Sequence, residues 1–355
     1  MDIRAESLYE VVGAIHLHSD FSDGSLSIPE IAQIAESKNI DYLMFSDHNT
    51  LEPKRQGLEG WQGRVLVIIG CEINDPDDRN HYLAFRIHQE PEEGLNAKEY
   101  VRWINKVGGF GVIAHPAEKR SFSDAYPPYP WTDWDVEGFD GIEIWNQLSE
   151  WLEGVTWRNF PWRIWHPLRS IRFPVWETLE RWDQLNRSRR VVGVGGIDVH
   201  DFHIKLFGFL PVEIYPYKVQ FRSIRTHVLL DKPFRSEQKQ MPFKEAERDL
   251  FKALSFGRSF ISNASIGNAK DFRFWAENKN QIFFMGSRIP NQGELVFRIQ
   301  SPLPGVIRLL RDGQEVERQK GRTLDYQSQR NGVYRVEIFR KRRGWVYSNP
   351  IVVGV

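Results

Sequence analysis

Short runs of apolar residues, bounded by turn-forming and polar residues, recur through the first part of the chain. Near-continuous apolar runs of this length are typical of strands that are buried on both faces of a parallel sheet. Seven such strands are expected, at Val11–Leu17, Tyr42–Phe45, Val65–Ile69, Tyr82–Ile87, Phe110–Ala114, Gly141–Trp145 and Val191–Ile197.

Helical patterns lie between several of these runs. Ser27-Ile28-Pro29-Glu30 is a capping box with an early proline, and it predicts a helix that continues to Lys38. A second helix is expected from about Asn96 to Lys106, ending at Gly108-Gly109. The alternation of strands and helices predicts an α/β fold, either a parallel barrel or a doubly wound sheet.

Short motifs that contain histidine, aspartate or glutamate decide between these two architectures. Each one is expected at the carboxyl end of a strand, where α/β barrels build their active sites. Seven strands that each deliver a residue to one end favour a barrel, because an open sheet gathers its ligands at a single switch point. We therefore expect a distorted seven-stranded (β/α)7 barrel.

Two regions depart from this rhythm. Residues 121–190 contain nine tryptophans and a proline cluster, which indicates an insertion that either packs internally or contacts substrate. A helix at Glu245–Leu254 and a strand at Ser259–Ser262 follow the barrel strands, and later runs alternate with a period of two, with turns at Asp312-Gly313 and Asn331-Gly332. We therefore expect a hydrolase barrel at residues 1–270 and a small antiparallel β-sandwich at residues 271–355.

Composition narrows the class of protein. Among the 355 residues, Lys+Arg and Asp+Glu are both 47, so the formal charge is zero and favours neither a nucleic-acid nor a membrane partner. No stretch approaches the roughly 18 apolar residues that span a bilayer, and the amino terminus has no secretory pattern. A lone cysteine, Cys71, excludes an internal disulfide and fits a reducing compartment, so a cytoplasmic location is expected.

Imidazoles and carboxylates are concentrated in the strand-ending motifs, and no thiolate accompanies them. His16 and His18 are two apart on a strand, so both side chains are expected on one face. Glu72 ends a buried strand, where an unpaired charge is strongly disfavoured and where two oxygens can bridge two cations. The complete set of candidate ligands is His16, His18, Asp23, His48, Glu72, His81, His115, Asp198 and His200. Such a set is typical of hydrolytic Zn, Mn or Fe centres, and about two to three divalent transition-metal ions are expected.

These motifs, in this order, resemble the polymerase and histidinol phosphatase (PHP) family of metal-dependent phosphoesterases over roughly residues 11–262. The resemblance implies a trinuclear site. The first ion would be held by His16, His18, Glu72 and Asp198, the second by Glu72, His81 and His115, and the third by Asp23, His48 and His200. The insertion and the β-rich tail resemble the carbaryl-hydrolase-like branch of the family.

The resemblance implies hydrolysis of a small-molecule phosphate ester by a metal-bound hydroxide held by Glu72, Asp198 and His200. Cleavage of a carboxylic or carbamic ester or amide at the same metals is one alternative, and an inactive metal-stabilised scaffold is another. Glu143, Asn146 and Arg258 are candidate substrate contacts. Asp47 and Asp201 flank ligands, so each is expected either to orient an imidazole or to be solvated. The sequence does not define an oligomeric state.

Overall fold

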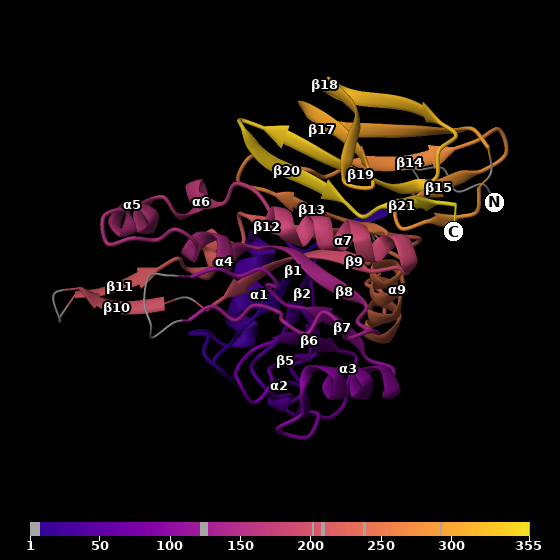
Figure 1. Ribbon diagram of the computed structural model, residues 1–355. Helices are drawn as coiled ribbons and strands as arrows, with labels where there is room; N and C mark the ends of the chain where they lie inside the picture. The colour runs from indigo at the N-terminus through magenta and orange to yellow at the C-terminus, as the bar shows by residue number, and fades with distance from the viewer. Residues whose placement is uncertain are drawn as a thin grey trace. The chain divides into compact units, whose positions relative to one another are not determined.

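The computed structural model describes residues 8–120, 127–200, 202–206, 210–236, 239–291 and 293–354 (Figure 1). The chain divides into two compact units. The N-terminal unit comprises residues 12–172 and 195–225, and the C-terminal unit comprises residues 1–11, 173–194 and 226–355.

Parallel strands form one part of the sheet in the N-terminal unit. Their order is β9 (Val192–Val199), β1 (Tyr9–Leu17), β2 (Tyr42–Phe45) and β4 (Val65–Ile69), with β3 (Gly60–Gln62) antiparallel to β4. Every residue of β2, β4 and β9 is buried, as the apolar runs predict. The pairing of β1 with both of its neighbours is irregular between Ile15 and Leu17, at the position of His16.

The other part of this sheet is mixed, which makes the expectation of a (β/α)7 barrel wrong. β5 (Cys71–Ile73), β6 (Tyr82–Phe85) and β7 (Phe110–Ile113) pair antiparallel, whereas β7 and β8 (Gly141–Asn146) are parallel. The physical reason lies in the connection between β5 and β6. A parallel neighbour needs a crossover of a dozen or more residues, and residues 74–81 are too few to provide one.

The two helices predicted from capping patterns are confirmed. α1 (Ile28–Ser37) starts after Ser27, whose backbone N–H donates to Glu30 over 3.0 Å. α3 (Ala97–Lys106) starts after Asn96, whose side chain accepts the N–H of Glu99 over 3.1 Å. The remaining elements of the unit are α2 (Glu52–Arg55), α4 (Gln147–Leu152), α5 (Phe160–Trp165), α6 (Pro167–Ser170), β10 (Phe202–Leu206), β11 (Leu210–Ile214) and α8 (Tyr217–Gln220).

The tryptophans of the predicted insertion divide between the protein interior and the solvent. Trp131, Trp145, Trp151 and Trp182 are buried, whereas Trp157, Trp162, Trp165 and Trp176 are exposed. Neither α5 nor α6 contains a buried residue. Internal packing therefore accounts for only part of the tryptophan content of this region.

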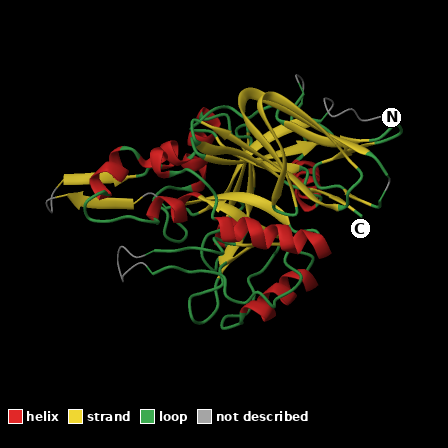
Figure 2. Ribbon diagram, turned by 45° about the horizontal axis from the view of Figure 1, so that its top comes forward, coloured by secondary structure: helices red, strands yellow, loops and turns green. Residues whose placement is uncertain are grey.

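The C-terminal unit is rich in antiparallel strands. It contains α7 (Trp176–Ser188), most of β12 (Ile224–Leu230), α9 (Phe243–Ser255) and β13 (Ser259–Asn263), followed by β14 (Arg273–Glu277), β15 (Ile282–Phe284), β16 (Arg288–Ile289), β17 (Leu295–Arg311), β18 (Gln314–Ser328), β19 (Gly332–Arg340), β20 (Arg343–Ser348) and β21 (Ile351–Val353). From Ser259 onward the described residues form only strands and loops (Figure 2). β17 is a single strand of 17 residues, and its pairing with β18 is irregular between Gln300 and Gly305.

The turn that joins β17 to β18 follows the sequence prediction. Asp312 and Gly313 have φ angles of 54° and 82°, and positive values at both positions are what a two-residue hairpin loop requires. The tail also shares a core with earlier residues. β13 pairs antiparallel with β20, and one buried cluster unites Leu229 and Phe260 with Phe297 and Trp345. The division of the chain into domains at residue 270 stays a prediction.

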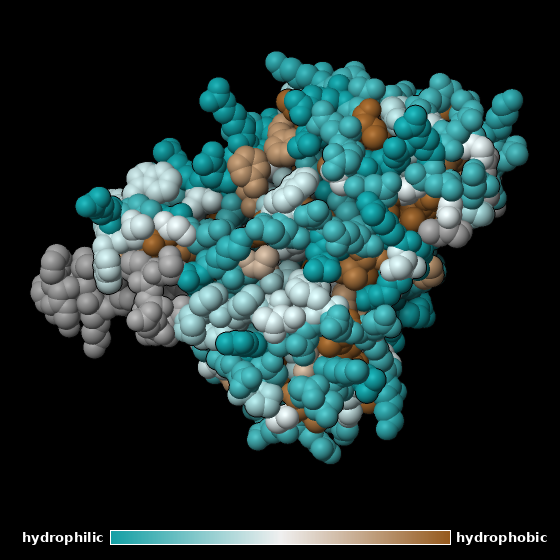
Figure 3. Space-filling view, in the orientation of Figure 1, coloured by the Kyte–Doolittle hydropathy of each residue, from teal (hydrophilic) through white to brown (hydrophobic). Residues whose placement is uncertain are grey.

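Most of the molecular face in Figure 3 is hydrophilic, and hydrophobic residues appear there as small separate groups. This is the usual outcome when the large apolar side chains are used in cores. Within the described ranges, no helix combines the length and the apolar character that crossing a bilayer requires.

Candidate metal centre

The predicted ligands come together at one edge of the sheet in the N-terminal unit. His48, His115 and His200 each lie shortly after a strand, as expected. His81 does not, because it immediately precedes β6. Since β6 runs antiparallel to β5 and β7, its amino end lies at the edge where their polar residues also lie. The expectation that every motif follows its strand is therefore wrong for His81, although its position at the centre is as expected.

Ligand atoms cluster tightly enough to hold ions. Among the residues that the structure describes, four groups each have potential ligand atoms within 4.8 Å of one another. They are His18, Asp23, His48 and His200; His16, His18 and Glu72; His16, His115 and Asp198; and His48, Glu72 and His81. All nine predicted ligands belong to at least one group.

Glu72 lies in the middle of the centre and is buried. Its Oε2 atom lies 2.9 Å from Nε2 of His16 and 3.2 Å from Nε2 of His18. Its Oε1 atom lies 2.7 Å from Nδ1 of His81 and 3.3 Å from Nε2 of His115. Nδ1 of His48 also lies 3.7 Å from Oε2. The two oxygens therefore face different sets of imidazoles, a position from which one carboxylate can contact two cations.

The buried groups of the centre favour positive charge between the carboxylates. Burial alone would raise the pKa of Glu72, but His16, His48 and His81 outweigh it and hold that pKa well below its ordinary value. Burial alone would lower the pKa of His81, but Glu72 and Asp78 raise that pKa to about 10. Metal cations would satisfy the same carboxylates while leaving the imidazoles neutral.

Buried ring nitrogens that make no hydrogen bond, although carboxylates lie nearby, indicate that the donor set fits metal ions. In the described part of the chain, both ring nitrogens of His18 and Nε2 of His81 are buried without a hydrogen-bond partner. Buried polar atoms are nearly always hydrogen-bonded, so each exception requires an explanation. Neutral imidazole nitrogens that point at carboxylates are suitable ligands for Zn, Mn or Fe.

The group that contains Asp23 lies on the solvent side. The side chain of Asp23 is 51% exposed and that of His48 is 31% exposed, whereas Glu72 is 1% exposed. Oδ2 of Asp23 lies 3.1 Å from Nε2 of His200 and 3.6 Å from Nε2 of His48. Burial alone would raise the pKa of Asp23, but His200 and His48 lower it strongly.

Asp47 supports the loop that carries Asp23. It is buried and accepts the backbone N–H of Ser19 over 2.7 Å, the Ser19 hydroxyl over 2.8 Å and the Ser22 hydroxyl over 2.7 Å. We expected Asp47 either to orient an imidazole or to be solvated. Its contacts are instead with Ser19 and Ser22. Asp201 lies outside the described residues.

The three predicted substrate contacts have other partners. Glu143 is buried and lies 2.8 Å from Nδ1 of His16, and Asn146 donates to Glu143 over 2.9 Å. Arg258 belongs to the C-terminal unit and pairs with Asp231, the closest contact being 2.5 Å. These contacts give each of the three side chains a structural partner, and a contact with substrate stays a prediction.

Two residues beside His81 were not predicted. The carboxylate of Asp78 lies 3.4 Å from Nε2 of His81, and the ring of Tyr129 stacks on the His81 ring at 5.0 Å. The carbonyl of Tyr129 also lies 3.2 Å from Nδ1 of His115. Asp78 is in a turn and Tyr129 is in a proline-rich segment, and neither position carries a local sequence signal for this role.

Three members of the centre have left-handed backbone. The φ angles are 66° at His16, 26° at His115 and 57° at Asp198. Such angles are uncommon for residues other than glycine, and strained residues cluster at functional sites because the surrounding structure must hold them. These same three residues form one of the four ligand groups.

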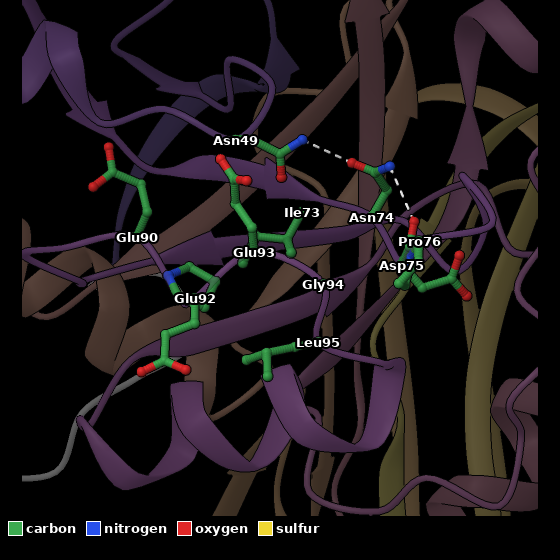
Figure 4. A pocket seen from close by; sticks show the side chains of 11 residues that line it. Asn49, Ile73, Asn74, Asp75, Pro76, Glu90, Glu92, Glu93, Gly94 and Leu95 are labelled. Atoms are coloured by element: carbon green, nitrogen blue, oxygen red, sulfur yellow. Dashed lines mark hydrogen bonds between the residues drawn. The ribbon is translucent and has the colours of Figure 1, made fainter.

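A pocket of about 430 Å³ adjoins the segments that follow His48 and Glu72 (Figure 4). Asn49 donates to Asn74 across it over 2.8 Å, and Asp75, Glu90, Glu92 and Glu93 line it. Arg55 pairs with Glu90 at 2.7 Å. Since carboxylates dominate the lining, the pocket is unfavourable for a phosphate group.

Residues 14–108 match the model of the PHP domain. This range contains the predicted ligands from His16 to His81, whereas His115, Asp198 and His200 lie beyond it. The chain is also 24% identical, over 147 residues, to the uncharacterized protein MJ1587 of Methanocaldococcus jannaschii. That match covers 37% of this chain and 80% of the relative.

Two solved structures have low sequence identity and a low TM-score to this chain. One is a two-domain protein of Bacteroides vulgatus that contains a predicted PHP-like metal-dependent phosphoesterase, with a TM-score of 0.46, 15% identity and coverage of 99% of this chain and 98% of that chain. The other is the lesion-specific endonuclease PfuEndoQ of Pyrococcus furiosus, with a TM-score of 0.41, 16% identity and coverage of 78% and 64%. Likenesses of this strength carry no argument about the activity of this chain.

Proposed function

We propose that this protein is a metal-dependent hydrolase that cleaves a small-molecule phosphate ester. The observation that carries the proposal is the position of Glu72, whose two oxygens face different sets of imidazoles within a cluster of nine ligand-type residues. The match of residues 14–108 to the PHP domain supports it independently of the geometry.

The proposed ion sites are those that the PHP resemblance implies, and they overlap the ligand groups in part. His16, His18, Glu72 and Asp198 would hold one ion, Glu72, His81 and His115 a second, and Asp23, His48 and His200 a third. The identity of the metal is open among Zn, Mn and Fe, because imidazole and carboxylate ligands suit all three. Bound divalent ions supply a hydroxide nucleophile near neutral pH and neutralise charge on phosphoryl oxygens.

The residues of the chain have complementary tasks in this scheme. Glu72, Asp198 and His200 would hold the nucleophile, and the solvent-side group around Asp23 would receive the substrate oxygens, since it is the most exposed part of the centre. The acidic pocket would not take the phosphate group, which belongs at the cations. The insertion and the β-rich tail support membership of the carbaryl-hydrolase-like branch, which we also propose.

The test is a comparison of substrates on the metal-loaded protein. p-Nitrophenyl phosphate or a phosphodiester should be cleaved faster than p-nitrophenyl acetate, because three cations match the dispersed negative charge of a phosphoryl group better than a single oxyanion. A preference for the acetate or for a carbamate would establish the alternative ester or amide hydrolase. Metal binding without any turnover would indicate a scaffold.

A further inference from the structure

We propose that Glu143, together with Asn146, is a positioning residue that fixes His16, His115 and Asp198 for metal binding. The inference rests on the proposed function only in taking these three residues as ligands. It assigns to Glu143 a role behind the ligands, in place of the substrate contact that the sequence suggests. All of these residues belong to the N-terminal unit.

Glu143 fixes the ring of His16. Its Oε1 atom lies 2.8 Å from Nδ1, while Nε2 of the same ring faces Glu72 at 2.9 Å and Asp198 at 3.5 Å. A carboxylate beside Nδ1 keeps the proton on that nitrogen, so the lone pair of Nε2 is directed at the cation position. Metal-binding histidines commonly have such a partner on the second ring nitrogen, and the partner sets both tautomer and orientation.

The second oxygen of Glu143 supports the other two members of the group. Oε2 accepts the backbone N–H of His115 over 2.8 Å and the Nδ2 group of Asn146 over 2.9 Å. The same Nδ2 group donates to Oδ2 of Asp198 over 3.3 Å. Glu143 and Asn146 thus contact all three residues that combine left-handed backbone with a ligand position.

The local fold fixes the direction of the Asn146 amide. Asn146 ends β8 and is the N-cap of α4, where its Oδ1 accepts the N–H of Ser149 over 2.9 Å. Because the oxygen is used by the cap, the NH2 group points toward Glu143 and Asp198. One residue therefore starts the helix and connects two carboxylates of the centre.

The carboxylate of Glu143 occupies the space that a side chain at Gly196 would need. A Cβ atom added to Gly196 on β9 would lie 1.6 Å from Oε1 and 2.5 Å from Cδ of Glu143. Glu143 is 1% exposed and Asn146 is 7% exposed, so neither is available to a substrate that approaches from solvent. A glycine at position 196 is thus required by the position of the carboxylate.

The first experiment compares Glu143→Gln with Glu59→Gln. Glu59 is a suitable control because it is a largely buried carboxylate of the same unit that accepts a backbone N–H, from Ile69 over 3.1 Å, and pairs with Lys54 at 3.0 Å. Zn²⁺ affinity of the metal-free proteins is measured by chelator competition. Glu143→Gln should weaken Zn²⁺ binding by about 10-fold to 100-fold, whereas Glu59→Gln should leave it unchanged.

A purely structural role would give a different pattern. It would lower the melting temperature of the metal-free protein and leave Zn²⁺ affinity and the Nδ1–H resonance of His16 in the zinc-loaded protein unchanged. We expect that resonance to shift in Glu143→Gln and not in Glu59→Gln. Equal Zn²⁺ affinities in wild type and Glu143→Gln would overturn the proposal.

Two further variants keep the test decisive if Glu143→Gln folds poorly. Asn146→Ser retains an N-cap but removes the amide donor, so it should weaken Zn²⁺ binding less than Glu143→Gln and in the same direction. Gly196→Ala should weaken Zn²⁺ binding when Glu143 is present. In the double variant with Glu143→Ala it should cause little further loss of Zn²⁺ affinity, because the methyl group enters the space that the carboxylate has left. Additive losses in this pair would contradict the proposed contact.

Failure of the proposed function is distinguishable from failure of this inference. If Glu143→Gln loses Zn²⁺ affinity while the wild type cleaves no phosphate ester, the inference stands and the proposed reaction falls. If the wild type cleaves phosphate esters and Glu143→Gln binds Zn²⁺ normally, the proposed reaction stands and the role assigned to Glu143 falls. A wild type that binds no Zn²⁺, Mn²⁺ or Fe²⁺ would overturn both.

Discussion

The side chains of Glu72 and Asp23 have different positions within the same centre, and they should have different effects on metal content. Glu72 is buried and contacts five imidazoles, whereas Asp23 is half exposed and belongs to the solvent-side group alone. Asp23→Ala should therefore remove about one ion per chain, and Glu72→Ala should remove more because it deletes a ligand shared by two ions. Elemental analysis of the purified variants measures the difference.

The control for this comparison is Asp20→Ala. Asp20 lies in the same loop as Asp23 but is exposed and belongs to none of the ligand groups. It should retain the metal content of the wild type. Equal losses in Asp23→Ala and Glu72→Ala would contradict the separate roles that we assign to them.

A buried hydrogen-bonded chain in the C-terminal unit gives a prediction for pH dependence. Glu10 lies 2.7 Å from Nδ1 of His227, whose Nε2 lies 2.8 Å from the hydroxyl of Ser262, and Glu10 also binds Arg273 over 2.6 Å. Ser262 is fully buried and the His227 ring stacks on Phe260 at 4.3 Å. The three side chains follow the order of a hydrolytic triad. Because the serine is buried, we assign this hydrogen-bonded series a structural role.

Burial alone would raise the pKa of Glu10, but His227 and Arg273 outweigh it and lower that pKa below 4.5. A carboxylate with a lowered pKa stabilises the fold above its unfolded pKa, and this contribution is lost as the pH falls through its folded pKa. Glu10→Gln should therefore reduce the free energy of unfolding at pH 7, by about 1–3 kcal/mol, and cost progressively less as the pH falls below 4.5.

Urea denaturation at a series of pH values measures this effect. Glu180→Gln, an exposed position on α7 of the same unit, serves as the control and should change little at any pH. A stability difference between Glu10→Gln and wild type that stayed constant down to acid pH would show that the charge of Glu10 contributes nothing.

At the scale of elements, strand β20 in the tail (residues 271–355) pairs with strand β13, which precedes residue 270. Phe260 of β13 pairs with Ser348 of β20, and Ile261 pairs with Tyr347. Removal of residues 271–355 would expose the apolar face of β13 and delete the partners of Leu229 and Phe260 in the shared core. We expect the fragment 1–270 to be much less stable than the full chain, because losses of buried aromatic residues cost about 3–5 kcal/mol each.

Limited proteolysis and circular dichroism of the fragment test this expectation. Early cleavage between residues 226 and 270, with the N-terminal unit cut later, is the expected pattern. A fragment that resists protease as well as the full chain and retains its metal content would show that the tail is an independent domain.

At the scale of the whole molecule, metal binding should be coupled to stability. The centre concentrates carboxylates and imidazoles from many strands and loops of the N-terminal unit, so an ion that binds there binds the folded chain and not the unfolded one. Saturation with Zn²⁺ at 100 times its dissociation constant should stabilise the fold by about 2.7 kcal/mol for one site. Chelation should lower the melting temperature correspondingly.

Thermal denaturation with and without chelator gives the measurement. Ca²⁺ is the control ion, because it prefers oxygen ligands and should raise the melting temperature less than Zn²⁺ at a centre rich in imidazoles. If Zn²⁺ and chelator leave the melting temperature equal, the cluster does not bind the ion in the folded state.

The sequence by itself determined the elements and the ligand set of this protein. Apolar runs located β1, β2, β4, β7 and β9, capping residues located α1 and α3, and the Asp312-Gly313 turn located a hairpin. These features depend on neighbouring residues along the chain, so a local pattern is sufficient to find them. The motifs also identified nine side chains that the fold brings together in overlapping groups.

Tertiary structure decided the rest, because strand direction and side-chain partners depend on contacts between distant residues. The antiparallel pairing of β5, β6 and β7 turned the expected barrel into a mixed sheet and placed His81 at the start of a strand. Glu143 is 127 positions from His16 in the sequence, and only the packing of β8 against β9 brings its carboxylate behind that ring. A local pattern shows that Glu143 ends a strand, but the group it faces is set by which strands become neighbours.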